Sequence, residues 1–434
     1  MQHLIQLELN EVNFEYVKHY AAEGKLPVLS QLMSNHGLTE TTSEDEYSDL
    51  EPWIQWVSAH TGLNRAEHSV FRLGDICEHD HLEQIWERLE RKGISVGAVS
   101  PMNAENRCSE PAFFLPDPWT KSALTAPPVL KRLHRAIAQM VNDNAQSRVE
   151  ASSIANLLIG MIYYGSATNY TEYIRLVARA PQKPWSKALL LDLLLSDVFC
   201  AQLRRTNAQF ATLFLNAAAH IQHHYLFNSS SYRGPNENPS WYISASGDPV
   251  LEVFQLYDRL VGRVLACFPS HRVIIATGLR QVPYPDVLYY WRLKDHENFL
   301  RKIGIPFASV EPRMSRDFVV FVSGPAEALQ AQALLEDCVA DDGIRLFDVD
   351  NRGTSLFVML VYPRQISSEL GFSVAGRHFT SLSDDTAFVA IKNGEHHGTG
   401  YLIDNGIEAR EAPKSRALTE LAGLAERHFL MRYD

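Results

Sequence analysis

The stretch LIQLELNEVNF, residues 4–14, decides the fold class of this chain. Its first six residues, Leu4–Leu9, are largely apolar, and the polar Asn10 and Glu11 follow them, a pattern typical of a strand that is buried on both faces and leads into a polar turn. Helical patterns separate it from later runs of the same kind. We therefore predict an α/β fold with a mostly parallel sheet flanked by helices. The later runs are GISVGAVS (93–100), FATLFLN (210–216) and HRVIIATG (271–278).

The segments between these runs carry the signals of crossover helices. Asn13–Met33 has helical spacing, and Asn13 is a suitable N-cap. Leu82–Arg91 is a second helical segment, which a lysine and a glycine follow. At the end of the chain, GYLIDNG (400–406) and a helix over Lys414–Arg427 are predicted to return to the main sheet.

Two long segments interrupt this alternation and predict the domain organisation. Residues 127–205 are almost entirely helical in pattern, which indicates a helical insertion. Residues 285–389 contain a β-α-β-β pattern, which indicates a small α+β cap. The core is then expected to consist of residues 1–126, 206–284 and 390–434.

Composition limits the classes of function. The chain has 434 residues with 40 Lys and Arg against 51 Asp and Glu, so its net charge of −11 disfavours binding to nucleic acid or to an anionic membrane. The longest apolar stretches, Ile154–Tyr164 and Ala188–Cys200, are shorter than the roughly 20 residues that a membrane span needs. We predict that both are buried helices and that the chain has no membrane span.

The cysteines and the N-terminal stretch bear on the cellular compartment. Five scattered cysteines without a CxxC pair do not form a disulfide framework in a chain of this length. The stretch MQHLIQLELNEV has no basic region and no uninterrupted apolar run, unlike a signal peptide. We therefore expect a cytoplasmic protein. We also expect its partner to be a small-molecule or glycan substrate, and the oligomeric state stays open.

The densest group of chemically active side chains is AAAHIQHHYLF (217–227), directly after the buried run 210–216. It places His220, His223 and His224 within five residues, at spacings that let two of them share a helix face and hold a metal ion or a substrate oxyanion. A second pair, His396 and His397, lies near the C-terminus. The alternative, that these histidines only cap the ends of strands, stays open.

Candidate carboxylates lie in and after the first strand, and another lies just before an aromatic-rich helical stretch. Period-2 alternation puts Glu8 and Asn10 on one face of the strand, with Glu11 in the turn beyond. Glu51 precedes a helical stretch that contains Trp53 and Trp56. The carboxylates could serve as general acid and base, or Glu8 could only form a buried ion pair. The tryptophans could line a sugar site, or they could only pack in the core.

Several segments, in the order in which they occur along the chain, resemble the motifs of the alkaline phosphatase superfamily. The resemblance is strongest to its branch of type I phosphodiesterases and nucleotide pyrophosphatases. Gly24–Leu32 is similar to the family's G-x-L-P-x-L-x-x-L segment, and the run before it to the family's opening strand and helix. WVSAHTGLNRAEHSVF (56–71), AHIQHHYL (219–226) and GEHHGTGYLI (394–403) resemble the segment around the nucleophile and two histidine motifs. The resemblance implies an alkaline-phosphatase-like core, and it does not extend over the helical insertion.

Most positions at which the family holds two metal ions and a Thr or Ser nucleophile differ here. The metal-binding Asp positions fall on Asn10 and Ala219, and an Asp-His pair falls on Thr277-Gly278. Glu51 stands where the nucleophile is expected. Only His223 and His396 match the family's histidine ligands, so we expect no cofactor, or at most one divalent ion such as zinc or manganese, and a zinc content well below one equivalent.

The sequence therefore predicts a hydrolase or transferase whose site lacks the two-metal set and which cleaves a glycosidic bond in a glycan by acid–base chemistry. A metal-dependent phosphodiesterase, phosphatase or sulfatase-like hydrolase, and a non-catalytic protein that binds a sugar or nucleotide, are the alternatives. We expect Glu8, Asn10, His223 and His396 to meet in one pocket. The candidate catalytic residues are Glu8, Glu11, Glu51, His220 and His224, the candidate substrate-binding residues are Asn10, Trp53, Trp56, His397 and Thr277, and the candidate ligands of a single metal ion are His223 and His396.

Overall fold

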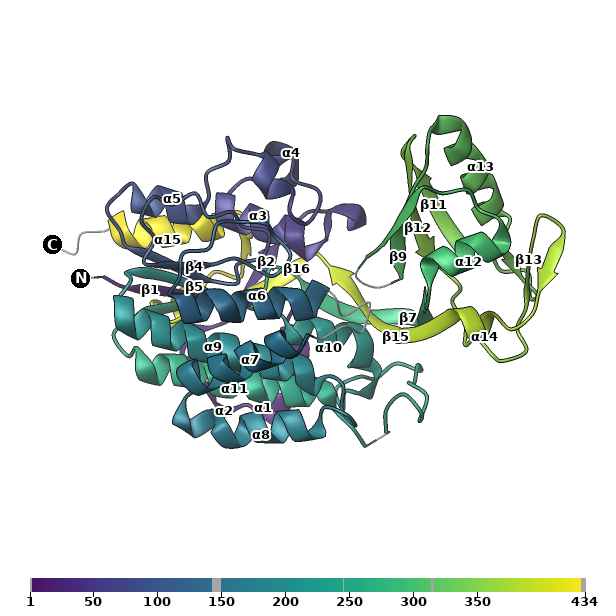
Figure 1. Ribbon diagram of the computed structural model, residues 1–434. Coiled ribbons are helices and arrows are strands. Elements are labelled where there is room, and N and C mark those ends of the chain that lie inside the picture. The colour runs from purple at the N-terminus through teal and green to yellow at the C-terminus, as the bar shows by residue number, and fades with distance from the viewer. Residues whose placement is uncertain (1, 143–149, 245, 314–315, 431–434) are drawn as a thin grey trace.

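The computed structural model describes residues 2–142, 150–244, 246–313 and 316–430. Its largest sheet has eight strands in the order β17-β2-β16-β6-β1-β5-β3-β4 (Figure 1). The strands are β1 (Leu4–Leu9), β2 (Thr39–Thr42), β3 (Val96–Val99), β4 (Phe113–Leu115), β5 (Phe210–Leu215), β6 (Arg272–Ala276), β16 (Thr399–Asp404) and β17 (Ser415–Ala417).

The predicted fold class is confirmed by the pairing of these strands. All four apolar runs form strands of this sheet, and β1 lies at its centre, parallel to both β5 and β6. Only β16 runs antiparallel to its neighbours β2 and β6. Every residue of β1 and β5 is buried, because helices cover both faces of the sheet. The carboxyl ends of β1, β5 and β6 therefore lie at one edge of the sheet.

Two layers of helices enclose the sheet (Figure 1). The Asn13 side chain accepts a hydrogen bond of 2.9 Å from the Glu15 backbone N–H, so its predicted role as N-cap of α1 is confirmed. The last helix begins later than predicted, since Ser415–Ala417 pairs with β2 as a strand. One layer contains α1 (Phe14–Ala22), α2 (Pro27–His36), α9 (Ser186–Thr206), α10 (Ala217–Tyr225) and α11 (Pro249–Cys267), and the other contains α3 (Pro52–Thr61), α5 (Ile85–Glu90) and α15 (Glu420–Leu430).

The predicted helical insertion contains α6 (Pro128–Asn142), α7 (Ala151–Tyr164), α8 (Tyr170–Arg179) and α9. As predicted, α9 is largely buried, and it packs against β3 and β5. The prediction that Ile154–Tyr164 is a buried helix is wrong. Only one side of α7, with Gly160 against Leu133, packs on neighbouring helices, and the opposite side leaves Ile162 72% exposed. Within the described ranges, no helix combines the length and apolar character needed to cross a bilayer.

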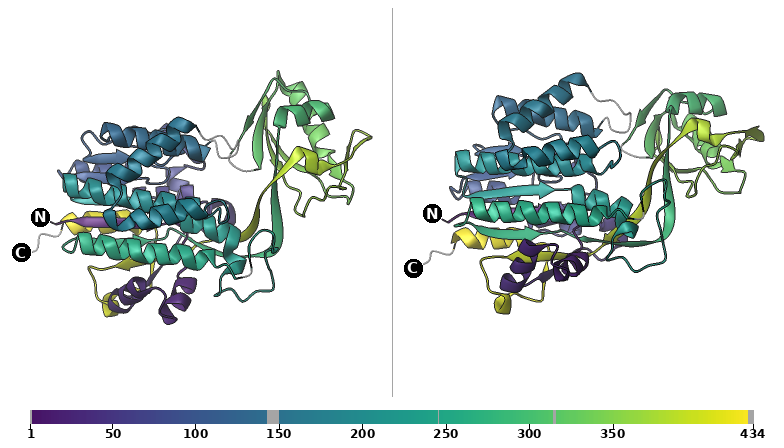
Figure 2. Two further views of the ribbon diagram at one scale, coloured as in Figure 1. Left: turned by 60° about the horizontal axis from the view of Figure 1, so that its bottom comes forward. Right: turned by 90° about the horizontal axis from the view of Figure 1, so that it is seen from below.

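The cap has a hydrophobic core of its own, separate from the cores of the main sheet. Its predicted β-α-β-β pattern corresponds to β9 (Asp317–Phe321), α13 (Pro325–Glu336), β11 (Phe347–Asn351) and β12 (Ser355–Leu360). A long antiparallel pair, β7 (Arg280–Leu293) and β15 (Thr386–His397), connects the cap to the main sheet (Figure 2). We call this pair the arm. The boundaries proposed for the three parts stay a prediction. The cap also contains α12 (His296–Ile303), β8 (Ser309–Pro312), β10 (Val339–Ala340), β13 (Phe372–Val374), β14 (Arg377–Phe379) and α14 (Leu382–Asp385).

Candidate functional site

Three side chains from distant parts of the chain meet beyond the carboxyl end of β1. Glu11 lies in the turn after β1, His223 on α10 and His396 near the end of β15. Glu11 Oε2 lies 3.1 Å from His223 Nε2 and 3.5 Å from His396 Nε2, and the two imidazole nitrogens are 3.3 Å apart. We call Glu11, His223 and His396 the triad.

The backbone of Glu11 has an unusual conformation, with a φ of 59°. A non-glycine residue in this left-handed region is strained and persists only where its surroundings fix it. The Glu11 N–H donates to the Thr277 carbonyl at 2.9 Å, and its carbonyl accepts from Gln222 Nε2 at 3.0 Å. These bonds hold the turn so that the carboxylate points at the two histidines.

Buried groups on two other helices fix the position of α10. Asp192 Oδ2, on α9, accepts hydrogen bonds from the Ala217 N–H at 2.7 Å and from the Tyr257 hydroxyl at 2.6 Å. Ala217 is the first residue of α10, so this carboxylate binds the free N–H of the helix that carries His223. The position of His223 is therefore fixed by a hydrogen bond between α10 and the buried Asp192.

Burial raises the pKa of Asp192 to about 6, so the folded protein binds its proton more tightly than the unfolded chain does. The stability that this group contributes is therefore present at pH 4 and lost as the pH rises through about 6. We expect the free energy of unfolding of the wild type to fall by roughly 2 kcal/mol, relative to that of Asp192→Asn, between pH 4 and pH 7. Urea unfolding of both proteins at several pH values measures this, and a difference independent of pH would contradict it.

Amide side chains surround the triad. Asn10 Nδ2 donates to Glu11 Oε1 at 3.0 Å and to Asn216 Oδ1 at 2.8 Å. Gln281, the second residue of β7, places its Nε2 against Glu11 Oε2 and 2.8 Å from His223 Nε2. Both oxygens of the Glu11 carboxylate are therefore occupied by neighbouring groups of the chain.

Charges within the triad shift the pKa values of Glu11 and His396. Burial opposes the ionisation of Glu11, but attraction to His396 and His223 outweighs it and lowers the pKa of Glu11 well below its ordinary value. Burial also opposes the charged form of His396 and by itself would lower its pKa. The attraction of the Glu11 carboxylate outweighs burial, so the pKa of His396 is raised. The site therefore favours an ionised Glu11 and attracts positive charge.

Glu51 borders the triad on its open side. It immediately precedes α3, its side chain is 37% exposed, and its Oε2 lies 3.7 Å from His396 Nδ1. Its side chain makes no capping bond to α3. Burial raises the pKa of Glu51, and Glu11 acts in the same direction, while His396 opposes both. Glu51 is thus the one carboxylate of the predicted set that is both next to the triad and accessible from solvent.

Two cations of the arm and the cap lie over tyrosine rings near Glu51. Lys392 Nζ lies 3.8 Å from the ring centre of Tyr284, and the Arg316 guanidinium lies 4.2 Å from that of Tyr290. Burial lowers the pKa of Lys392, and the charge of Lys392 in turn acts on Glu51. The open side of the site therefore carries two cations and aromatic surface, with the carboxylates of Glu51 and Glu395 beside Lys392.

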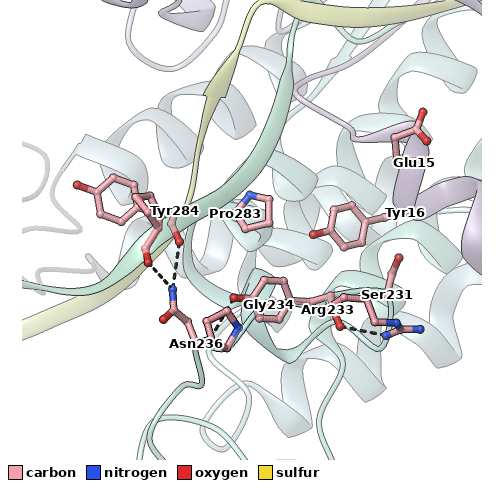
Figure 3. Close-up of a pocket in the computed structure, with 11 residues that line it drawn as sticks. Glu15, Tyr16, Ser231, Arg233, Gly234, Asn236, Pro283 and Tyr284 are labelled. Atoms are coloured by element: carbon pink, nitrogen blue, oxygen red, sulfur yellow. Dashed lines mark hydrogen bonds between the residues drawn. The ribbon is translucent and has the colours of Figure 1, made fainter.

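A pocket of about 510 Å³ opens beside the same stretch of the arm (Figure 3). Tyr16, Tyr232, Pro283 and Tyr284 line it, and Figure 3 shows the Tyr16 hydroxyl directed toward Pro283. Pro283 is two residues beyond Gln281, which pairs with His396 across the arm. A cavity of this size, with aromatic walls, can accept a ring of a small molecule.

The expectation that Glu8 meets His223 and His396 in one pocket is wrong. Its side chain is fully buried, and its Oε1 accepts hydrogen bonds from Gln6 Nε2 at 2.8 Å and from His60 Nε2 at 2.9 Å. Glu8 points toward the layer that contains α3, whereas the triad lies beyond the end of the strand. Strand alternation indicated correctly that Glu8 is buried, but it did not determine what Glu8 would contact.

Other predicted residues lie near the triad without joining it. Trp56 is completely buried, and its Nε1 donates to Asn10 Oδ1 at 2.7 Å. Thr277 Oγ1 is buried and accepts from the Tyr401 N–H at 2.8 Å. Both residues therefore support the site from within the core, and their predicted contact with substrate stays a prediction.

The remaining histidines and Trp53 point elsewhere. His220 is exposed, with its ring against that of His224, whose Nδ1 lies 3.3 Å from the Ile391 carbonyl. His397 is exposed and accepts from the Thr399 N–H at 3.2 Å. Trp53 donates from Nε1 to the Phe71 carbonyl at 3.1 Å. None of these bonds involves the triad, and their catalytic or binding roles stay predictions.

The sequence analysis missed several residues of this site, among them Asn216, Lys392, Arg316 and Gln281. Of these, Gln281 is the one in contact with the triad. It lies four residues after Thr277, the position at which the resemblance led us to look for an Asp-His pair and found none. A search for polar side chains slightly farther along the chain, beyond the end of β6, would have found it.

The triad has the composition of a divalent metal site. One carboxylate oxygen and two imidazole nitrogens lie within 4.8 Å of one another, a donor set that suits zinc and leaves a position open. From the sequence we counted only two ligands, because we looked for the carboxylate at Asn10 and Ala219. Glu11 supplies a third, so the residues present fit one metal ion.

Comparison with known proteins gives neither a matching family model nor a matching curated protein. Among solved structures, the chain is similar to phosphonoacetate hydrolase from Sinorhizobium meliloti 1021, with 12% identity over 99% of this chain and 95% of that chain and a TM-score of 0.47. It is also similar to murine ectonucleotide pyrophosphatase/phosphodiesterase 5 in complex with AMP, with 10% identity over 100% and 96% of the two chains and a TM-score of 0.43. The human counterpart of the latter gives 10% identity over 99% and 96%, with a TM-score of 0.41. Similarity at this level does not define an activity.

Proposed function

We propose that this protein is a hydrolase of an anionic ester, of the phosphate or sulfate class, whose triad binds a single divalent metal ion. The meeting of Glu11, His223 and His396 carries the proposal, because it rebuilds a three-ligand site where the sequence motifs had lost theirs. A divalent cation bound there would supply Lewis-acid polarisation of an ester oxygen.

The residues around the triad have separable roles in this proposal. Glu51 Oε2, next to His396 and accessible from solvent, holds the proton that the leaving oxygen requires. Lys392 and Arg316 attract the anionic group of the substrate. The pocket beside Pro283 and Tyr284 receives the part of the substrate that does not react.

The glycosidic reaction that we first predicted fits this arrangement less well. It needs two carboxyl groups that reach opposite sides of the scissile bond. Glu8 is bonded to His60, and Glu11 is a metal ligand in this proposal, with its other oxygen accepting a hydrogen bond from Asn10. Glu51 is then the one accessible carboxylate of the three candidates, which favours the ester over the glycoside.

Metal binding gives the first test. We expect purified protein incubated with zinc or manganese and then desalted to retain about one equivalent, and we expect Glu11→Gln and His223→Ala to retain far less, since each removes one of three ligands. Elemental analysis and titration calorimetry measure this. His220→Ala is the matched control, because His220 lies on the same helix but is exposed and outside the triad.

Activity gives the second test. A panel of p-nitrophenyl phosphate, bis(p-nitrophenyl) phosphate, p-nitrophenyl sulfate and p-nitrophenyl glycosides distinguishes the reactions, and we expect turnover of an ester that chelation abolishes and added metal restores. Turnover of a glycoside that EDTA leaves unchanged would restore the glycosidic hypothesis. Binding of phosphate or sulfate esters without turnover, with metal present, would favour a non-catalytic protein.

A further inference from the structure

Two cysteines far apart in the sequence lie side by side in the core. Cys200 is on α9 and Cys267 is the last residue of α11, and these helices pack against each other in the same layer (Figure 1). Each cysteine shifts the pKa of the other through a side-chain interaction. Cys200 is fully buried, while Cys267 is partly exposed at the end of its helix. Cys267 is therefore the residue of this pair that is closer to solvent.

Two arginines surround the Cys267 sulfur. Arg204, one turn after Cys200 on α9, places its Nη2 2.6 Å from Cys267 Sγ. Arg263 is one turn before Cys267 on α11, and it also pairs with the buried Asp197. The Cys200 hydrogen bond and the two arginines outweigh burial and lower the pKa of Cys267 to about 5. The two arginines thus favour the thiolate form of Cys267, and Cys200 is its neighbouring thiol.

The other cysteines lack these features. Burial raises the pKa of Cys77, Cys108 and Cys338, so these side chains remain thiols at neutral pH. They serve as internal controls, because one preparation of the protein presents all five side chains to the same reagent.

We propose that Cys200 and Cys267 form a peroxide-sensitive dithiol site, in which Cys267 is the attacking residue and Cys200 the resolving residue. This site lies apart from the triad and does not depend on the proposed hydrolase function. Its co-reactant is hydrogen peroxide or an alkyl hydroperoxide, and its product is a reversible disulfide between α9 and α11.

The reaction balances in two steps. The Cys267 thiolate attacks one oxygen of hydrogen peroxide, the O–O bond breaks, and the departing hydroxide takes a proton from solvent, which leaves Cys267 as a sulfenic acid. Cys200 sulfur then attacks Cys267 sulfur, the S–O bond breaks, and the Cys200 proton leaves with the hydroxyl group as water. Two thiols lose two electrons in total, and one peroxide is reduced to two waters. A dithiol such as dithiothreitol reverses the reaction.

The first experiment uses wild-type protein. We expect iodoacetamide at pH 7 to label Cys267 at least about tenfold faster than Cys77 or Cys108, as peptide mass spectrometry measures, because alkylation follows the thiolate. After treatment with a slight excess of hydrogen peroxide, a tryptic digest without reductant should contain a cross-linked peptide pair with Cys200 and Cys267, which dithiothreitol removes. Labelling of Cys267 no faster than that of Cys77, together with no such peptide pair, would overturn the proposal.

Variants separate the two roles. In Cys200→Ser, peroxide should still oxidise Cys267, and dimedone should trap the sulfenic acid there, whereas in Cys267→Ser neither the adduct nor the disulfide should form. Arg204→Gln should slow the labelling of Cys267 several-fold, and Cys338→Ser is the matched control that should leave the disulfide intact. A disulfide or dimedone adduct that persists in Cys267→Ser would show that the assignment of roles is wrong.

Discussion

Replacement of Glu51 by glutamine is expected to lower kcat by on the order of a hundredfold or more on whichever ester the substrate panel identifies, because general acid catalysis contributes at least that much. Glutamine keeps the size of the side chain and removes the proton that Glu51 Oε2 would deliver. The side chain is 37% exposed and makes no capping bond to α3, so its replacement should leave the unfolding midpoint nearly unchanged. Steady-state kinetics with thermal unfolding of the same samples measures both effects.

The matched control is Glu46→Gln, an exposed glutamate in the same segment whose side chain forms no cap bond. It should retain the kcat and metal content of the wild type. Glu51→Gln should also retain its metal, since Glu51 lies outside the triad, and this separates loss of a proton donor from loss of the metal ion. Unchanged turnover in Glu51→Gln would assign the acid role to another group and remove Glu51 from the proposed mechanism.

Much of the core could be predicted from the sequence because its strands are buried on both faces. A strand in that position must be almost uniformly apolar, so the runs at residues 4–9, 93–100, 210–216 and 271–278 stand out in the sequence, and all four form strands of the main sheet. The apolar segment 154–164 looked equally buried, yet α7 covers a neighbour with one side only. Hydrophobicity alone does not indicate how many sides of a helix have a partner.

The candidate site was only partly predictable for a geometric reason. His223 and His396 were placed by their motifs, and they meet within 3.3 Å. The third ligand is displaced by one residue from the position that the resemblance indicated, from Asn10 to Glu11, and the left-handed turn at Glu11 allows this. A sequence pattern fixes neither a single positive φ nor the long-range contacts of Gln281, so neither could be foreseen.

The pairing of Cys200 with Cys267 illustrates the same limit. Nothing in the spacing of the five cysteines distinguishes these two, and we expected no disulfide framework among them. Their proximity depends on how α9 and α11 pack on the sheet, which is decided by the apolar faces of both helices and not by residues next to the cysteines.

Replacement of His60 by leucine is expected to lower the free energy of unfolding by about 3–5 kcal/mol, because it leaves the Glu8 carboxylate buried without its main partner. Both side chains are completely inaccessible to solvent, and Gln6 alone would then bond to Glu8. Replacing Glu8 and His60 together by leucine should cost far less than His60→Leu alone, since no buried charge remains unpaired. Urea unfolding of the wild type, His60→Leu, Glu8→Leu and the double variant forms a complete cycle. Because Glu8 is bonded to His60 of α3 and to Gln6, and not to the triad, Glu8→Gln should keep the kcat of the wild type in its folded fraction. A hundredfold loss of turnover in Glu8→Gln, with an unchanged unfolding free energy, would instead make Glu8 catalytic, as strand alternation first suggested.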